Sequence, residues 1–479
     1  MKSPLLRGVS VWFALVALNG CTLLPMVGPD YRLPSFSLPA LWTTPAPPAA
    51  PGADLAGWWR QLDDPLLDSL IDEALLGSVD LKLAQSRLEQ ARAAREQAVS
   101  GLFPSLSAST GASRNKTSPA ISALPARTLY DAGFDAAWEI DLFGATRRGV
   151  EAAKAELAAS EASLNNVRVS LLAEVAQNYV ELRAYQLRLT IARDNLASQS
   201  ETVQITEWRN QAGLVASSDV EQARSSREQT RASIPDLEIG RAAAENRLAV
   251  LLGRNPGDLH GQLAEAKNFP EVPASVGIGI PAEVLRQRPD LIVAERKLAA
   301  ETARLGQKQA QRFPSLNLGA SFGWQAYSFG ALGGADSLMR GISGTLAATL
   351  FDGGRLRSAV DIQSAVQEQA LLSYQGSVLG ALEEIENALT AYAASRERLA
   401  ARLAAAEAAR NAAALSRNLY QSGLADFQRV LDTERTRLSA EDSLATARAS
   451  RLTSLIALYK ALGGGWNAAA PAIPENGKS

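Results

Sequence analysis

Cysteine and histidine are almost absent from this sequence. The 479 residues contain one of each, Cys21 and His260, so a disulfide within the chain is excluded and a His/Cys metal site is not expected. No phosphate-binding loop, nucleophile elbow or metal-ligand cluster occurs. The sequence therefore predicts no catalytic residues, no cofactor and no enzyme.

The sequence also lacks a large net charge and a long apolar run. The net charge is −2, which gives no basic surface for nucleic acid. No segment has about 18 or more consecutive apolar residues, so no transmembrane helix is predicted, and a membrane crossing would require strands. With 47% hydrophobic and 20% charged residues, the chain is expected to fold around a large core.

The amino terminus has the layout of an exported protein. Basic Lys2 and Arg7 precede an apolar run from Val9 to Leu18, which predicts a signal peptide over residues 1–20. Leu18-Asn19-Gly20-Cys21 resembles the lipobox of bacterial lipoproteins, which implies that Cys21 becomes the lipid-carrying first residue. The alternative is an inert cysteine beside a signal that is cut elsewhere. Residues 21–64, rich in Pro and Ala, are expected to form a lipidated N-terminal tether.

Short sequences recur 210 positions apart. Phe103–Leu106 returns as Phe313–Leu316 (103 to 313), and Gly213-Leu214 returns as Gly423-Leu424 (213 to 423). This offset predicts an internal duplication. The two copies are expected at 65–253 and 289–463, with a linker at 254–288 and a C-terminal tail at 464–479.

Two segments in each copy alternate between apolar and polar residues, which is typical of strands with one face of each kind. They lie at about 102–113, 130–143, 313–326 and 340–352, with Trp138 and Trp324 on the apolar faces. Segments of this kind are typical of outer-membrane strands, and a soluble sheet packed on helices is the alternative. Four strands are too few to close a barrel, so several copies are expected to share one.

The remaining periodicity is helical. Helices are predicted at about 65–100, 145–211, 217–252, 355–421 and 425–462. We expect Ser217-Ser218-Asp219 to cap the third of these and Pro235 to kink it. A long cytoplasmic coiled-coil scaffold would show similar helices, but the strand pairs and the export signal argue against it.

Several motifs in order resemble one protein family. They include Val27-Gly28-Pro29-Asp30-Tyr31, Arg288-Pro289-Asp290-Leu291 and Gly423–Phe427. With the duplication, they resemble the TolC-like outer-membrane factors of tripartite efflux systems, and among these the NodT-type lipoproteins that serve RND pumps. The resemblance implies an α+β fold and a homotrimeric channel. Its 12-stranded transmembrane β-barrel takes four strands from each chain, and a long periplasmic α-helical barrel continues it.

The same resemblance implies a function and partners. The chain would conduct drugs, metals or other small molecules passively from the periplasm to the exterior. A periplasmic adaptor (membrane fusion) protein and an inner-membrane RND pump would be its partners, and it would sit lipid-anchored in the outer membrane. A duct for protein secretion and a structural lipoprotein without a pore remain the alternatives.

The candidate site residues of such a channel are its lumen acids and its gate. Asp135, Glu139 and Asp141 follow the polar positions of one predicted strand, where three copies would form an acidic mouth that favours cations. Ordinary solvated strand polarity is the alternative. The resemblance implies a gate at the helix tips, with Asp426 as the nearest acid and Arg209 and Arg429 as possible bridges. Asp426 is alternatively a helix cap.

Overall fold

The computed structural model describes residues 26–44, 55–116, 118, 120, 125–273 and 281–467. The chain divides into two units. The first, here called the sheet unit, comprises the described residues of 1–35, 87–161 and 293–375. The second, the helical unit, comprises those of 36–86, 162–292 and 376–479. Cys21 and residues 468–479 lie outside the described residues, so the predicted acylation site and most of the predicted tail have no structural account here.

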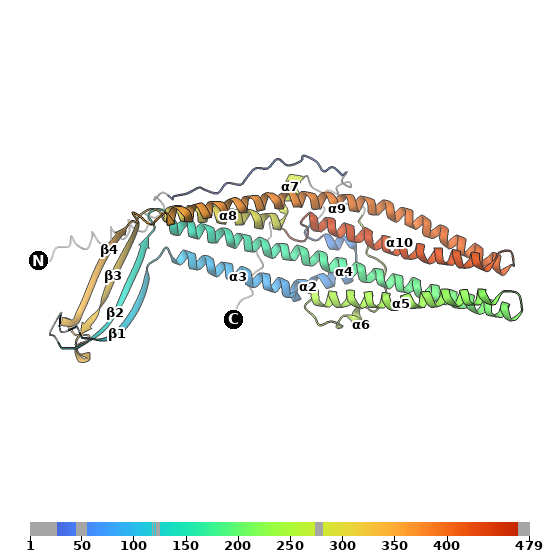
Figure 1. The fold of residues 1–479 in the computed structure, drawn as a ribbon, viewed down its shortest axis with the longest axis horizontal. Coiled ribbons are helices and arrows are strands. Elements are labelled where there is room, and N and C mark those ends of the chain that lie inside the picture. The colour runs from blue at the N-terminus through green and yellow to red at the C-terminus, as the bar shows by residue number, and fades with distance from the viewer. Residues whose placement is uncertain are drawn as a thin grey trace. The chain divides into compact units, whose positions relative to one another are not determined.

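The sheet unit contains four antiparallel strands in chain order (Figure 1). They are β1 (Ser105–Asn115), β2 (Arg127–Ile140), β3 (Ser315–Ala326) and β4 (Leu338–Ala347). In the register, Ala136 lies opposite both Leu106 and Ala320, and Ala320 lies opposite Ile342. Even-numbered residues of all four strands therefore share one side, the apolar face, and odd-numbered residues share the other, the polar face. This confirms the predicted alternation.

Two of the predicted strand ends are wrong, because side chains bind the backbone beyond them. β2 ends at Ile140, and the next residue, Asp141, accepts a 2.8 Å hydrogen bond from the Arg147 backbone amide. β4 ends at Ala347 rather than 352, and Asp352 accepts hydrogen bonds from the Gly354 and Leu356 amides. Both carboxylates lie at the start of a long helix, where they satisfy amides that lack helical partners.

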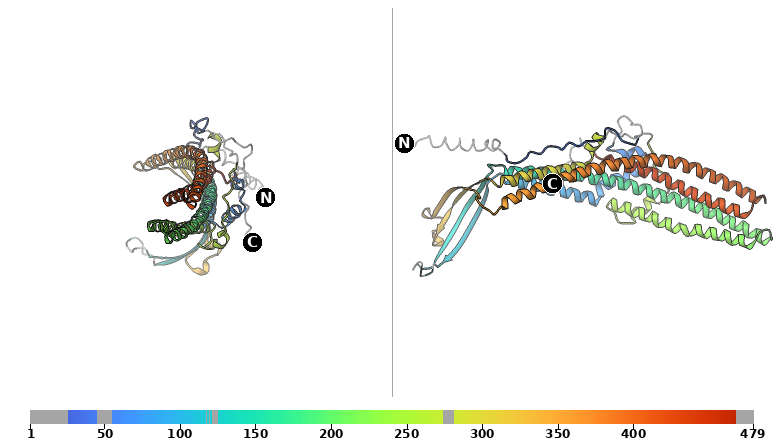
Figure 2. Two further views of the ribbon diagram at one scale, coloured as in Figure 1. Left: turned by 90° about the vertical axis from the view of Figure 1, so that its right-hand side faces the viewer. Right: turned by 45° about the horizontal axis from the view of Figure 1, so that its top comes forward.

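The two copies have helices of equal length. α4 (Ala145–Gln211) and α9 (Arg355–Gln421) each have 67 residues, while α5 (Ser217–Leu251) and α10 (Phe427–Ala461) each have 35. Within the helical unit, α4 runs beside α5 and α9 beside α10 as two hairpins (Figure 2). At 1.5 Å per residue, each long helix extends about 100 Å.

Other helical predictions need correction. The stretch from 65 to 100 is two helices, α2 (Pro65–Gly77) and α3 (Val79–Ser100), separated at Ser78. Ser217 lies inside α5, whose N-cap is Ala216 without a side-chain bond; Pro235 lies within this helix. The linker contains two short helices, α6 (His260–Leu263) and α7 (Pro281–Gln287), which precede α8 (Pro289–Ala310). His260 starts α6 and contacts Glu245 at 3.0 Å.

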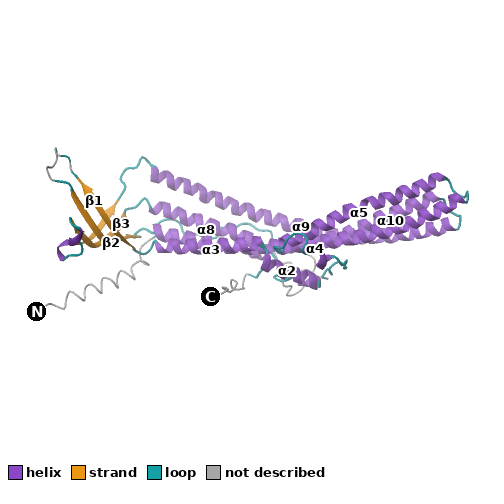
Figure 3. Ribbon diagram, turned by 90° about the horizontal axis from the view of Figure 1, so that it is seen from below, coloured by secondary structure: helices purple, strands orange, loops and turns teal. Residues whose placement is uncertain are grey.

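The core of the helical unit forms where the two copies meet. A single-turn helix, η2 (Trp58–Leu62), places Trp58 against Tyr459, with stacked rings 5.0 Å apart. Leu172, Leu248 and Ile385 belong to the same buried cluster. Figure 3 shows how helices dominate the described elements. None of these helices combines the length and hydropathy that a bilayer crossing needs.

The N-terminal segment of the sheet unit is held by a buried arginine. Arg148 in α4 donates to the Val27 and Gly28 carbonyl oxygens at 3.2 and 3.1 Å and to the Asp30 carboxylate at 2.8 Å. Tyr31 donates a 2.6 Å hydrogen bond to Glu295 in α8. The motif at residues 27–31 therefore fixes this extended segment to two helices.

Candidate functional site: sheet faces and helix tips

The polar face of the sheet carries acids on one strand only. Asp131, Asp135 and Glu139 follow one another at every fourth residue of β2, so they lie about 13 Å apart along the strand. Asp135 lies opposite Ser107 and Ser321, and Glu139 lies opposite Asn317. Asp135 and Glu139 are exposed. Asp131 was missed, although the same alternation places it on this face.

Asp141 does not belong to this row. It lies beyond the end of β2, and its side chain is only 12% exposed beside Arg147, with Oδ2 3.2 Å from Arg147 Nε. Its prediction as a lumen acid on the strand is therefore corrected. The strand alternation reaches position 141 in sequence, but the turn into α4 redirects the side chain.

The apolar face of the sheet is exposed although its side chains are hydrophobic. Leu106, Phe134, Phe322 and Ile342 are all exposed, and Ile342 reaches 93%. A shallow groove of about 590 Å³ crosses all four strands here, and its lining includes these four side chains with Ala136, Ala320 and Arg340. A large exposed apolar surface on a stable sheet indicates contact with a partner or with lipid.

Two equivalent turns connect the long helices at the tips of the helical unit. Gly213 and Gly423 have φ angles of 70° and 77°, which favour glycine, and they end α4 and α9. In both turns, the backbone amide of the residue after the glycine donates an equivalent hydrogen bond. Leu214 N donates to Arg209 O and Leu424 N to Leu419 O, both at 2.8 Å. The leucine side chains are left 71% and 76% exposed.

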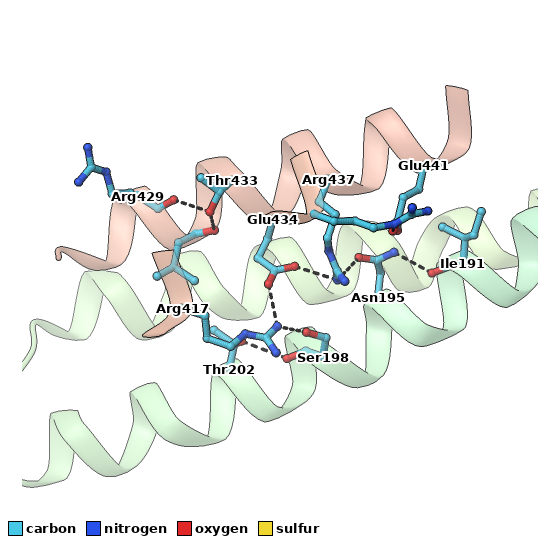
Figure 4. A network of polar contacts seen from close by, with 12 residues as sticks. Ile191, Asn195, Ser198, Thr202, Arg417, Arg429, Thr433, Glu434, Arg437 and Glu441 are labelled. Carbon is cyan, nitrogen blue, oxygen red and sulfur yellow. Dashed lines mark hydrogen bonds and ion pairs between the residues drawn. The ribbon is translucent and has the colours of Figure 1, made fainter. Parts of the chain in front are cut away.

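The predicted gate residues all lie near these turns, but in the described part of the chain no hydrogen bond or ion pair joins their side chains to one another. Asp426 is the N-cap of α10 and accepts a 2.9 Å hydrogen bond from the Arg429 amide. Arg209 donates to the Tyr420 carbonyl oxygen at 3.2 Å, and its guanidinium lies 4.3 Å from the centroid of the Tyr420 ring. Within the described part of the chain, the Arg429 side chain has no ion-pair partner, and Figure 4 shows it pointing away from the polar network.

A polar network that the sequence analysis missed lies behind the tips (Figure 4). Glu434 in α10 is nearly buried and accepts a 2.7 Å bond from Arg417 in α9. Its other oxygen lies 3.0 Å from Arg437, which donates a 2.6 Å bond to Asn195 in α4. Arg417 also contacts Ser198 in α4. The spacing of Glu434 and Arg437 is ordinary for charged residues on a helix. Nothing in the local sequence therefore distinguishes these two residues.

No group of three or more His, Cys, Asp or Glu side chains among the described residues could hold a metal ion. The geometry is instead that of a wall with chemically different faces and of hairpin tips joined by polar contacts.

Comparison with known proteins decides the family. The profile of the outer membrane efflux protein family matches residues 70–254 and 280–464, which together exceed half of the chain. The chain belongs to the outer membrane efflux protein family. Its two matched ranges begin 210 positions apart (70 to 280), the same offset as the sequence repeat.

Individual relatives agree along nearly the whole chain. Nodulation protein T of Rhizobium leguminosarum bv. trifolii is 30% identical, with 97% of this chain and 99% of that protein covered. The pyoverdine export outer membrane protein OpmQ of Pseudomonas aeruginosa is 34% identical over 94% of this chain and 97% of that protein. The solved structure of the outer-membrane channel OprN has a TM-score of 0.87 and 38% identity, covering 92% of this chain and 99% of OprN.

These findings confirm the main reading of the sequence. The fold of this outer membrane efflux protein is TolC-like, and its function is that of an outer-membrane channel component of an efflux pump. The family consists of channel proteins rather than enzymes.

Proposed function

We propose that three copies of this chain form one passive channel through the outer membrane. The sheet is the observation that carries the proposal. Its outer strands, β1 and β4, each have one edge that no other described strand pairs with, and its apolar face is exposed. Long unpaired edges are normally covered by another strand. If β4 of one copy pairs with β1 of the next, three copies give twelve strands with the apolar faces toward lipid.

In this arrangement the polar face lines the lumen. Three copies each of Asp131, Asp135 and Glu139 then form successive acidic rings, which favour cations over anions. The protein supplies no energy of its own and catalyses nothing. An inner-membrane pump of the RND type and a periplasmic adaptor protein would drive and couple transport, and drugs, metals or other small molecules would be the cargo.

Ion selectivity in planar bilayers tests the lumen assignment. We expect the wild type to conduct with a preference for cations, and the double variant Asp135→Asn/Glu139→Gln to lose much of it. Asp141→Asn is the matched control, because that carboxylate is bound to Arg147 and lies beyond the strand. An unchanged selectivity in the double variant would mean that the polar face does not line the pore.

The tips of the two hairpins are proposed as the gate and the adaptor contact. Asp426, Arg209 and Arg429 all lie beside the turns. The exposed Leu214 and Leu424 offer two equivalent apolar knobs to a partner. Engagement of the adaptor there would separate the hairpins and open the closed end.

Lipid attachment at Cys21 is a separate part of the proposal. Two or more acyl chains on this residue would anchor the protein stably in the outer membrane, with the helices extending into the periplasm. Radiolabelled palmitate should enter the wild type and be absent from Cys21→Ser. Labelling of the serine variant, or none in the wild type, would contradict the anchor.

A further inference from the structure

The apolar face of the sheet carries two charges and both are arginines. Among the even-numbered strand residues, Arg114 of β1 and Arg340 of β4 are the charged side chains, and both are exposed. The acids of the four strands, Asp131, Asp135 and Glu139, all have odd numbers and lie on the polar face. The acids of the four strands thus lie on the polar face alone, whereas every charge on the apolar face is positive.

Both arginines lie toward the same end of the sheet. Arg114 is the second-last residue of β1, and Arg340 is the third residue of β4. Because the strands are antiparallel, these positions are near the loop end, where β1 and β3 finish and β2 and β4 begin. In the described part of the chain, neither guanidinium has an ion pair or hydrogen bond.

Aromatic side chains collect at this end of the apolar face. Tyr130 packs edge-on against Phe329 with ring centroids 5.8 Å apart, and Trp324 packs against Phe322 at 5.4 Å. Tyrosine and tryptophan are enriched where a membrane's apolar interior meets its headgroups. The arginines therefore lie at the level expected for lipid headgroups.

A partner for these arginines has to come from outside the sheet. An unpaired arginine on a lipid-facing strand is unfavourable toward the middle of the bilayer. The strands that would meet at the seam between copies, β1 and β4, contain no acid that could pair with these arginines. Arg340 also lines the apolar groove with Phe134, Phe322 and Ile342, so its positive charge lies beside the apolar side chains of the groove.

We propose that this face binds a phosphate-bearing lipid at its loop end. At the seam of the proposed channel, where β4 of one copy lies beside β1 of the next, the phosphate accepts hydrogen bonds from Arg340 of one copy and Arg114 of the other, and an acyl chain lies along the groove. Guanidinium groups match phosphate geometry well, and the groove volume of about 590 Å³ lies in the usual range of small-ligand sites. The inference rests on the proposed function, since it takes the apolar face to be the membrane face.

Native mass spectrometry of the full-length protein in mild detergent tests the proposal. The probes are phosphatidylglycerol and phosphatidylcholine with identical acyl chains, added to the wild type, Arg340→Gln, Arg114→Gln and Arg127→Gln. We expect a preference for phosphatidylglycerol that falls about fivefold with each of the first two substitutions. Arg127→Gln is the control, because Arg127 lies at the same end but on the polar face, and it should keep the preference.

Three results would overturn the proposal. One is equal binding of both lipids by the wild type. Another is an unchanged preference in Arg340→Gln and Arg114→Gln. The third is full displacement of phosphatidylglycerol by equimolar inorganic phosphate, which would mean that the arginines bind the free ion. The same spectra report the oligomer: loss of the trimer would contradict the proposed channel, whereas an intact trimer without lipid preference would contradict only the lipid site.

Discussion

Single residues fix the N-terminal segment of the sheet unit. Gly28 has a φ of 97°, and a Cβ built there would lie 2.3 Å from the Cα of Gly306 in α8. Both glycines are needed for the segment to pass this close to the helix. Arg148 then binds the carbonyl oxygens of two successive residues, Val27 and Gly28.

Gly28→Ala should release this segment. We expect a loss of about 1–3 kcal/mol from overpacking, beyond the strain of the positive φ. The measurement is thermal unfolding together with the rate of trypsin cleavage after the exposed Arg32. Gly257→Ala is a matched control, because Gly257 has a φ of 95° with open space around it. Equal effects of the two substitutions would mean that the Gly28–Gly306 contact is unimportant.

Asp68 in α2 gives a pH-dependent prediction. Burial raises the pKa of this carboxyl, and Asp72 and Asp64 add to the effect. Its Oδ1 is buried without a hydrogen-bond partner. The folded state therefore holds this proton more tightly than the unfolded state, so stability falls as the pH rises from the ordinary aspartate pKa of about 4 through the raised pKa of the folded state.

Asp68→Asn should remove that fall. At neutral pH the variant should unfold at a higher denaturant concentration than the wild type, and the difference should vanish at acidic pH. Asp80→Asn, at an exposed position in the first turn of α3, serves as the control and should leave the fall in place. A variant less stable than the wild type at neutral pH would contradict the burial argument.

At the scale of elements, the polar network joins α4, α9 and α10. Glu434 is nearly buried between Arg417 and Arg437. Removing one partner of a buried ion pair leaves the others uncompensated. Glu434→Gln should therefore destabilise the protein by about 3 kcal/mol. On the same helix, Glu441 pairs with the more exposed Arg410, so Glu441→Gln should change stability by about 1 kcal/mol or less. Similar midpoints in chemical denaturation for the two variants would show that the network does not hold the helices together.

Two substitutions separate the role of Asp426 as the cap of α10 from the role of its charge. Asp426→Ala removes both the carboxylate and the cap, whereas Asp426→Asn keeps the cap and removes the charge. We expect increased antibiotic leakage and conductance in the alanine variant. Leakage in the asparagine variant as well would assign the closure to the charge. The gate assignment fails if both variants match the wild type.

Local patterns predicted most elements well. Alternation of apolar and polar residues places each strand on its correct face, and the 210-residue offset anticipates helices of equal length in the two copies. The strand ends were misplaced because Asp141 and Asp352 bind backbone amides at the following helices. Such side-chain contacts end a strand in the structure, although the alternation of apolar and polar residues continues in the sequence.

At the scale of the whole molecule, the contacts that the sequence concealed connect distant segments. Arg148 binds a segment about 120 residues earlier, and Arg417 contacts Ser198 across 219 positions. No periodicity relates such pairs, and a single sequence does not show which charges face one another. Asp135 and Glu139 were predicted because their face follows from local alternation, whereas Glu434 depends on how three helices pack.

The central claim is that the four-stranded sheet is completed by other copies of the chain. Native mass spectrometry of protein extracted from membranes in mild detergent tests it most directly. A trimer with three acylated chains is predicted, because the unpaired edges of β1 and β4 then pair between neighbours and Cys21 carries lipid. A stable, folded monomer would contradict the shared sheet and leave the two edges without partners.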